Sequence, residues 1–290
     1  MSKLDNLALM EAWLNDIQNH VCVNEPNMLT IFNIYREEAL FGRRYITDDL
    51  TQLTKGATIL EVGAGSLLLS CQLVREGFKV VALEPVGDGF SHFDRLRELV
   101  LERAEVLDCV PEMLNQRAED LSIIDRFDYA FSVNVMEHVS DVKAVITNVG
   151  RSLHSKARYH FTCSNYAFPY EQHFNIPTLF SKSLTEKVFG KKIYGSDMPD
   201  PIGTWQSLNW ISVTQVSKLV SQIPEISAEF NRQFLVLTLA RVIYDKEFAA
   251  RRSKGIRAFI KVLLYFRLHH LTGLIPVTLQ PVIDCTLTRK

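Results

Sequence analysis

The stretch Thr58–Ser66, with the sequence TILEVGAGS, constrains the fold more than any other part of the chain. It begins with a short apolar, β-branched run between Gly56 and Gly63, which is too short for a helix and predicts a buried parallel strand. A helical pattern over 67–76 follows directly and ends at Gly77. A strand, a glycine turn and a helix N-terminus in this order favour a nucleotide-binding turn. The glycines let the backbone approach a ligand, and the helix start offers N–H donors.

A second strand favours this interpretation over an ordinary tight strand–helix connection. Residues 79–83 are apolar and lead to Glu84, about twenty residues after the glycines, where a carboxylate can accept hydrogen bonds from both ribose hydroxyls. The third glycine of the dinucleotide fingerprint is replaced by Leu68, and Glu61 adds a carboxylate that would repel a pyrophosphate. Because the same carboxylate suits a cationic amino-acid ligand, the turn favours S-adenosylmethionine over NAD.

Four segments occur in an order and spacing that are specific when taken together: EVGAGS at 61–66, ALEP at 82–85, RAEDL at 117–121 and FDYAFSVNVMEHVSD at 127–141. On these segments the chain resembles the class I S-adenosylmethionine-dependent methyltransferases, in particular the small-molecule branch that includes quinone-biosynthesis enzymes. The resemblance covers roughly residues 56–165. It implies an α/β, Rossmann-like, doubly wound sheet of seven mostly parallel strands with an antiparallel last strand, a helical N-terminal cap and helical C-terminal additions. It also implies S-adenosyl-L-methionine as cofactor.

The resemblance also assigns the cofactor contacts. In the family, the loop that corresponds to 117–121 holds the adenine ring through an acidic side chain and the backbone of the following alanine. Here Arg117 replaces the usual aspartate, so a contact through the backbone of Ala118 is favoured. Asn134 follows a predicted strand over 129–133 and is placed to face the methionine end of the cofactor. The expected cofactor-binding residues are Glu61, Gly63, Ala64, Gly65, Glu84, Pro85, Ala118, Glu119 and Asn134.

Two polar segments at strand ends are predicted to form the acceptor site. One is Asn134–His138, and the other is 164–174, where four aromatic residues, a histidine and a carboxylate follow a strand over 158–163. Methyl transfer is an in-line displacement, to which a protein contributes alignment, exclusion of water and sometimes a base. His138 or His173 is the expected base. The predicted catalytic residues are His138, His173, Glu171 and Tyr166.

Three alternatives to these site assignments stay open. Glu137 and His138 can simply begin the next helix, and Phe168 and Phe174 can be core residues. In the N-terminal helices, arginines such as Arg43 either meet a substrate or belong to a packed cap with solvated arginines.

The charge of the chain is unevenly distributed. The net charge is -1, yet residues 251–290 contain eight lysines and arginines against the single acid Asp284. A basic amphipathic helix over 254–271 predicts peripheral membrane contact through 251–271, and packing on its own domain is the alternative. We therefore predict three parts: a helical cap over 1–50, a cofactor-binding core over 51–164, and an acceptor-side lid with the remaining strands and the basic tail over 165–290.

Several classes of function are disfavoured. A net charge near zero and the lack of an RNA module or of an (Asn/Asp)-Pro-Pro-(Tyr/Phe) motif argue against nucleic acid as a partner. Five scattered cysteines without CxxC spacing predict reduced thiols and no zinc or iron–sulfur site, so no metal is expected. The chain shows no signal peptide and no apolar run of about 20 residues, which predicts a cytoplasmic protein.

The sequence thus predicts a methyltransferase that acts on a small-molecule or lipid-like acceptor, at oxygen rather than at carbon or nitrogen. The alternative is a catalytically silent, methyltransferase-like binding subunit, against which the intact Gly63, Gly65 and Glu84 argue. The sequence predicts neither the identity of the acceptor nor the oligomeric state.

Overall fold

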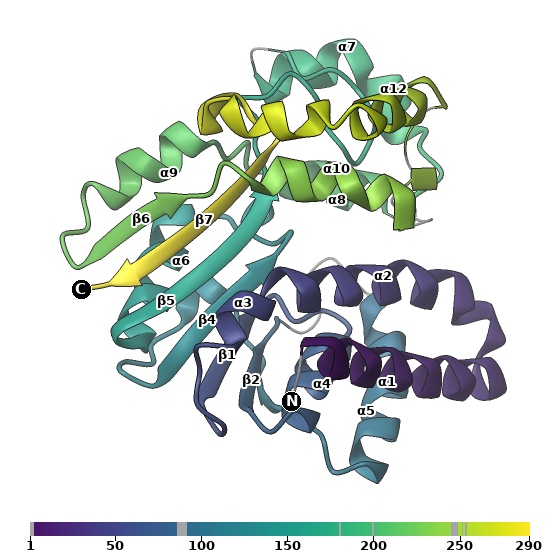
Figure 1. Cartoon of the computed structure of the whole chain (residues 1–290), viewed down its shortest axis with the longest axis vertical. Coiled ribbons are helices and arrows are strands. Elements are labelled where there is room, and N and C mark those ends of the chain that lie inside the picture. The colour runs from purple at the N-terminus through teal and green to yellow at the C-terminus, as the bar shows by residue number, and fades with distance from the viewer. Residues whose placement is uncertain are drawn as a thin grey trace. The chain divides into compact units, whose positions relative to one another are not determined.

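The computed structural model describes residues 3–85, 92–179, 181–198, 200–244, 249–250, 252 and 254–290. Its strands are β1 Thr58–Val62, β2 Lys79–Leu83, β3 Glu112–Leu114, β4 Phe127–Val133, β5 Leu153–Ser164, β6 Ile226–Phe230 and β7 Val282–Arg289. They form one seven-stranded sheet in the order β3-β2-β1-β4-β5-β7-β6, in which β7 runs antiparallel (Figure 1). The predicted Rossmann-like fold with an antiparallel last strand is therefore confirmed.

The chain forms two compact units. Unit 1 comprises Met1–Val133, Ala144–His160 and Arg289, and unit 2 comprises Asn134–Lys143, Phe161–Thr288 and Lys290. Strands β1 to β4 belong to unit 1 and β6 to unit 2. The predicted division by function into 1–50, 51–164 and 165–290 stays a prediction.

Both units contain helices. The longer helices in the first half are α1 Lys3–Asn24, α2 Leu29–Tyr45, α4 Leu68–Arg75, α5 His92–Val106 and α6 Val142–Ser152, with the short α3 Thr47–Leu50, η1 Pro26–Met28 and η2 Ala118–Asp120 between them. The later helices are α7 Lys182–Tyr194, α8 Pro201–Ser207, α9 Val213–Val220, α10 Phe234–Tyr244, α12 Lys254–Tyr265, η3 Leu268–Leu274 and η4 Val277–Leu279.

Strands β1, β2 and β4 are buried on both faces over most of their length, which explains their largely apolar sequence. β1 pairs in parallel with both β2 and β4, and Ile59 lies opposite Val80 on one side and Tyr129 on the other. Because side chains alternate along a strand, Ile59, Val80 and Tyr129 share one face of the sheet. They belong to one hydrophobic core with residues of α1, α2, α4 and α5.

The N-terminal helix is part of this core. α1 buries an apolar stripe that consists of Met10, Trp13, Leu14, Ile17 and Val21. The indole N–H of Trp13 also donates a 2.9 Å hydrogen bond to the carbonyl of Leu68 at the start of α4. The helix therefore belongs to the same hydrophobic core as the strands of unit 1.

A buried ion pair fixes α2 to the end of α4. Arg43 donates from Nε to Oε1 of Glu76 and from Nη2 to Oε2, both over 2.8 Å. The two side chains are only 1% and 3% exposed. This pairing gives Arg43 a structural partner, in place of the substrate contact or solvated position that the sequence allowed.

A second buried carboxylate joins α3 to two strands. Asp49 accepts a 3.0 Å hydrogen bond from the hydroxyl of Tyr129 in β4 and lies 2.6 Å from Nδ1 of His160 and 3.1 Å from Nη2 of Arg158 in β5. Burial alone would raise the pKa of Asp49, but these partners outweigh it and lower the pKa.

Unit 2 contains two helices that the sequence analysis did not predict. α8 begins at Pro201, and Asp200 caps it by accepting a 2.8 Å hydrogen bond from the N–H of Gly203. α9 buries Val213, Val216 and Val220 and is capped by Ser212. Both caps are ordinary N-cap chemistry.

The basic helix of unit 2 is shorter than predicted. α12 ends at Tyr265, and Arg267 adopts a left-handed conformation with φ 56° before η3 begins. α10, α12 and η3 pack against one another (Figure 1). Among the described residues, no helix combines the length and the apolar character needed to cross a membrane.

Replacing Glu76 with alanine should lower the free energy of unfolding by about 3–5 kcal/mol, because the guanidinium of Arg43 would stay buried without its counter-charge. Asp16→Ala is the matched control. The Arg103–Asp16 pair has the same two-bond geometry, at 2.7 and 3.0 Å, but its side chains are 30% and 34% exposed, so we expect only a small loss. Unfolding in urea measures both variants. Equal losses would contradict the structural role of the buried pair.

Candidate functional site

The glycine turn after β1 has a left-handed backbone conformation at both of its glycines. Gly63 and Gly65 have φ values of 73° and 50°, in the left-handed region that glycine adopts without steric cost. Leu67, the N-cap of α4, has a φ of 64° although it carries a side chain. The N–H of Gly63 donates a 2.8 Å hydrogen bond to the carbonyl of Leu83 at the end of β2. The turn is thus held against the second strand.

Glu84 lies in direct contact with the glycine turn. Its Oε2 accepts a 2.9 Å hydrogen bond from the backbone N–H of Gly65. Burial raises the pKa of Glu84, and the hydrogen bond from Gly65 opposes this rise. Two elements that the sequence assigned to one cofactor, the glycine turn and the acidic end of the second strand, are therefore adjacent.

Glu61 is buried behind the turn. Its carboxyl group accepts a hydrogen bond from the hydroxyl of Ser70 in α4. Burial raises the pKa of Glu61 to about 8, and the negative charge of Glu84 adds to this. The carboxyl group therefore holds its proton at neutral pH, and a cation bound nearby would favour its ionised form.

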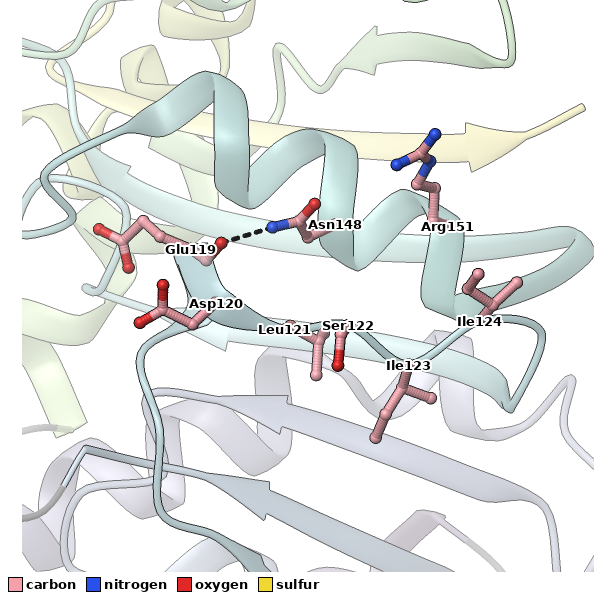
Figure 2. Close-up of a pocket in the computed structure, with 8 residues that line it drawn as sticks. All are labelled: Glu119, Asp120, Leu121, Ser122, Ile123, Ile124, Asn148 and Arg151. Atoms are coloured by element: carbon pink, nitrogen blue, oxygen red, sulfur yellow. Dashed lines mark hydrogen bonds between the residues drawn. The ribbon is translucent and has the colours of Figure 1, made fainter.

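The loop predicted to hold an adenine ring folds as η2. Ala118 is buried, and Arg117 forms a 3.1 Å ion pair with Glu119. The amide of Asn148 donates a 2.5 Å hydrogen bond to the backbone carbonyl of Glu119, which fixes the loop to α6 (Figure 2). Beside the loop is a pocket of about 320 Å³ lined by Glu119, Asp120, Leu121, Ser122, Ile123, Ile124, Asn148 and Arg151.

Unit 2 contains the polar segment that follows β4. Asn134 has a φ of 56°, a left-handed conformation that asparagine tolerates better than most residues. Its N–H donates a 2.8 Å hydrogen bond to the carbonyl of Thr162. Further along, the amide of Asn209 donates to the carbonyls of Met136 and Val139, each over 2.7 Å, and holds the turn that carries His138.

The hydrogen-bond network assigns the tautomer of His138. Its Nδ1 lies 2.7 Å from Oγ of Ser207, and that hydroxyl donates its proton to the carbonyl of Thr204. Ser207 must therefore accept from Nδ1–H, which leaves the lone pair of His138 on Nε2. Burial lowers the pKa of His138 to about 3, with further lowering by the charges of His173 and Lys182. This imidazole is neutral at physiological pH.

His173 is oriented by a buried carboxylate. Its Nδ1 lies 2.6 Å from Oε1 of Glu171, which also accepts from the backbone N–H of His173 and from the hydroxyl of Tyr166. The other oxygen of Glu171 accepts a 2.8 Å bond from the N–H of Phe174. Burial alone would raise the pKa of Glu171, but the bonds from His173 and Phe174 lower it, so the carboxylate is ionised.

Glu137 lies beside the two histidines and is fully buried, at 0% exposed. Its Oε1 accepts 3.3 Å hydrogen bonds from the N–H and the hydroxyl of Ser164, whereas Oε2 has no hydrogen-bond partner among the residues that the structure describes. Burial raises the pKa of Glu137. One ring nitrogen or carboxylate oxygen from each of Glu137, His138 and His173 lies within 4.8 Å of the other two.

Aromatic rings surround this cluster. Tyr166 stacks on Trp210, with ring centroids 4.5 Å apart and planes inclined by 23°. Phe174 is buried and meets Trp205 edge to face at 5.7 Å, which is the environment of a core residue. The open question about Phe174 is thus answered in favour of packing.

The structure brings the predicted site residues together in two groups. In unit 1, Glu84 contacts the turn formed by Gly63, Ala64 and Gly65, while Glu61 lies buried behind it. In unit 2, His138, His173, Glu171 and Tyr166 form one connected cluster. The roles assigned to all these residues, and to Pro85, Ala118, Glu119 and Asn134, stay predictions.

The sequence analysis placed Glu137 in the predicted acceptor segment without a catalytic role, and it gave no role to two further residues of the second cluster, Ser207 and Trp210. Glu137 had a usable signal, because it adjoins His138 at the end of a strand. Ser207 and Trp210 had none, since Ser207 is 69 residues from its partner His138. The expectation of no metal site considered cysteine spacing, which says nothing about a histidine–glutamate cluster formed by separate loops.

Comparison with known proteins places the chain among methyltransferases. A family model described as a methyltransferase domain matches residues 60–161. Uncharacterized proteins from two strains of Mycobacterium tuberculosis are each 44% identical over 284 residues, which are 98% of this chain and 96% of theirs. A ubiquinone biosynthesis O-methyltransferase from Paramagnetospirillum magneticum is 31% identical over 140 residues, 48% of this chain and 52% of that protein. The chain thus matches about half of that relative.

Solved structures agree with the fold. The phosphoethanolamine N-methyltransferase 2 of Haemonchus contortus, in complex with phosphomonomethylethanolamine and S-adenosylhomocysteine, matches with a TM-score of 0.51 at 14% identity. The match covers 94% of this chain and 60% of that one, so the chain spans less than two thirds of that protein. At this identity the likeness concerns the fold alone.

Replacing Glu61 with glutamine should stabilise the ligand-free protein at high pH. The carboxyl group titrates near 4.5 when unfolded and near 8 when folded, so its contribution to stability is lost as pH rises between these values. Glutamine keeps an acceptor for Ser70 and does not titrate. We expect a gain of roughly 2–4 kcal/mol at pH 8 and less than about 1 kcal/mol at pH 5, measured by urea unfolding. The exposed Glu105→Gln is the control, and a gain independent of pH would contradict the assignment.

Proposed function

The chain belongs to the class I S-adenosylmethionine-dependent methyltransferases, and we propose that it methylates an oxygen atom of a small-molecule or lipid-like acceptor. S-adenosyl-L-methionine is its cofactor, and methyl transfer is its reaction. The observation that carries the proposal is the contact between the glycine turn and Glu84 in unit 1.

The residues of unit 1 suit the cofactor in charge and shape. The left-handed glycines bring the backbone close to a ligand, and the carboxylate of Glu84, already oriented by the N–H of Gly65, can accept hydrogen bonds from ribose hydroxyls. Glu61 can supply negative charge toward the ammonium group of the methionine moiety. Because the pKa of Glu61 is raised to about 8, binding of that cation would be coupled to loss of a proton.

The cluster in unit 2 supports an oxygen acceptor. A hydroxyl group must lose its proton as its oxygen attacks the methyl carbon. The ionised Glu171 orients His173 by a 2.6 Å contact at Nδ1, so Nε2 of a neutral His173 carries the lone pair that accepts such a proton. His138 is the weaker base because burial lowers its pKa to about 3. The name of the relative from Paramagnetospirillum magneticum, an O-methyltransferase, agrees with this choice.

Alignment is the other contribution that these side chains can make. The attacking oxygen, the methyl carbon and the sulfonium sulfur must lie in line, and fixed side chains reduce the entropy lost in reaching that arrangement. The stacked pair of Tyr166 and Trp210 is a rigid apolar surface on which a flat acceptor can rest. The hydroxyl of Tyr166 also donates a hydrogen bond to Glu171, so this ring is fixed both by stacking on Trp210 and by that hydrogen bond.

The apolar surface of α12 and the residue after it supports a lipid-like acceptor. Phe259 and Phe266 are each 63% exposed, and Tyr265 between them is 82% exposed. Lys254, Arg257 and Lys261 lie on the same short helix. Exposed aromatic rings beside basic side chains favour contact with the surface of an anionic membrane.

Calorimetric titration of S-adenosylmethionine tests the cofactor site. We expect micromolar binding to the wild-type protein and at least about tenfold weaker binding to Glu84→Ala, because the ribose hydroxyls lose their charged acceptor. Glu105→Ala, which removes an exposed glutamate, should bind like the wild type. A wild-type protein that does not bind the cofactor would contradict the proposed function.

An acceptor screen with phenols, quinone precursors and lipid-linked sugars then follows, with transfer of a labelled methyl group as the measurement. A labelled ether product supports the proposal, and a labelled amine product contradicts the oxygen assignment. Cofactor binding with no transfer to any acceptor would favour the alternative of a silent binding subunit.

Co-sedimentation with anionic vesicles at low salt tests the membrane contact. The wild-type protein should bind, and the double variant Phe259→Ser, Phe266→Ser should bind several-fold less because it loses the rings that enter the headgroup layer. Ile124→Ser changes an exposed apolar residue of unit 1 and serves as the control. The absence of wild-type binding would contradict this part of the proposal.

A further inference from the structure

We propose that Glu137, His138 and His173 of unit 2 bind a divalent transition-metal ion, for which zinc is the best match. The three side chains come from the turn after β4 and from the loop after β5. Metal binding by this group goes beyond the proposed function and does not depend on it.

The positions of the donor atoms fit one ion. One ligand atom of each residue lies within 4.8 Å of the other two. An ion bound tetrahedrally at about 2.1 Å from each ligand needs donor atoms about 3.4 Å apart, so small side-chain rotations suffice. The imidazole rings of His138 and His173 lie edge to face at 71° with centroids 5.5 Å apart, so they are neighbours without being stacked.

The histidines are held as metal ligands usually are. A ligating histidine almost always donates its second ring N–H to a carboxylate, a carbonyl or another polar group, which fixes the tautomer and the ring orientation. Here Nδ1 of His173 is 2.6 Å from the buried carboxylate of Glu171, and Nδ1 of His138 is 2.7 Å from the hydroxyl of Ser207. Both networks place the lone pair on Nε2, the nitrogen that an ion would contact.

The buried carboxylate of Glu137 is the independent observation that points to a ligand. Ser164 donates both of its hydrogen bonds to Oε1, and Oε2 is completely buried with no partner in the described part of the chain. Such an atom is destabilising when nothing compensates it, because it has lost its hydrogen bonds to water. A cation at the centre of the cluster would compensate Oε2, which would be its third ligand beside the two imidazoles.

A catalytic dyad alone explains fewer of these contacts. The Glu171–His173 pair would serve as a base without Glu137 or His138. It leaves the proximity of His138 and the unpaired oxygen of Glu137 without a role. A metal ion accounts for all three side chains together with the partners behind them.

The donor set selects the class of metal. Two neutral imidazoles and one carboxylate suit zinc and its first-row neighbours, whereas magnesium and calcium prefer oxygen ligands throughout. Three protein ligands leave a coordination position for water or for an oxygen of a substrate. The side chain of His173 is 21% exposed, so solvent and an ion can reach the site from its side.

An open coordination position would also refine the acceptor class, a step that rests on the proposed function. A hydroxyl group bound to the ion would release its proton to solvent, because the metal stabilises the resulting alkoxide or phenoxide. That oxygen would then form the bond to the methyl carbon while the carbon–sulfur bond breaks and S-adenosylhomocysteine leaves as a neutral thioether. In the metal-bound form, the histidines act as ligands, and the metal replaces the imidazole base.

Zinc titration of tag-free protein that has been stripped with a chelator tests the site, in the absence of cofactor and acceptor. We expect one equivalent to bind with micromolar or tighter affinity, and bound cobalt to show the visible absorption of a four- or five-coordinate ion. His173→Ala should weaken binding at least about tenfold. Glu137→Gln, which keeps the volume of the side chain, should do the same, while the exposed His154→Ala should bind like the wild type.

Two results would overturn the site: no stoichiometric binding by folded wild-type protein, or equal binding by wild type and His173→Ala. Circular dichroism of each variant establishes that it is folded. Because the titration contains neither cofactor nor acceptor, it is independent of catalysis. A protein that binds zinc but transfers no methyl group would contradict the proposed function and support the metal site.

Discussion

The hydrogen bond from the backbone of Gly65 to the carboxylate of Glu84 is the contact on which the cofactor side of this protein depends. It forms only because β1 and β2 are parallel and in register, so that their carboxyl ends arrive at the same edge of the sheet. The left-handed glycines then turn the N–H of Gly65 toward that edge. The hydrophobic core beneath the strands sets this register, since a slip by one residue would move every buried side chain to the wrong face.

Buried carboxyl groups recur through both units, and their surroundings decide what each can do. Glu76 and Asp49 are compensated by cationic or hydrogen-bonding partners; Glu76 joins α2 to α4, and Asp49 joins α3 to the sheet. Glu61 and Glu137 are compensated incompletely, and burial raises the pKa of both. Partial compensation costs stability and is characteristic of sites that bind something else. The carboxyl groups that destabilise the fold are thus the ones that a bound ligand would stabilise most.

The strands of the sheet, the glycine turn and the position of Glu84 could be predicted because each follows from residues a few positions apart. The partners of polar side chains that lie far apart in the sequence could not be predicted. Arg43 and Glu76 are 33 residues apart, and nothing local distinguishes that arginine from a solvated one. α8 was missed because Pro201 suggests a turn and also suits the first turn of a helix, and only the side chain of Asp200 decides between them. The cluster around Glu137 needed the tertiary fold, since its members lie on different loops.

The N-terminal helix has a consequence for the order in which the chain is made. Trp13 and Ile17 leave the ribosome early, but α1 packs against α4 and α5 as well as against α2. Until α5, which ends at Val106, has been synthesised, the apolar stripe of α1 lacks part of its packing and stays exposed to water and to other nascent chains. A version of this protein truncated before α5 would leave that stripe incompletely covered.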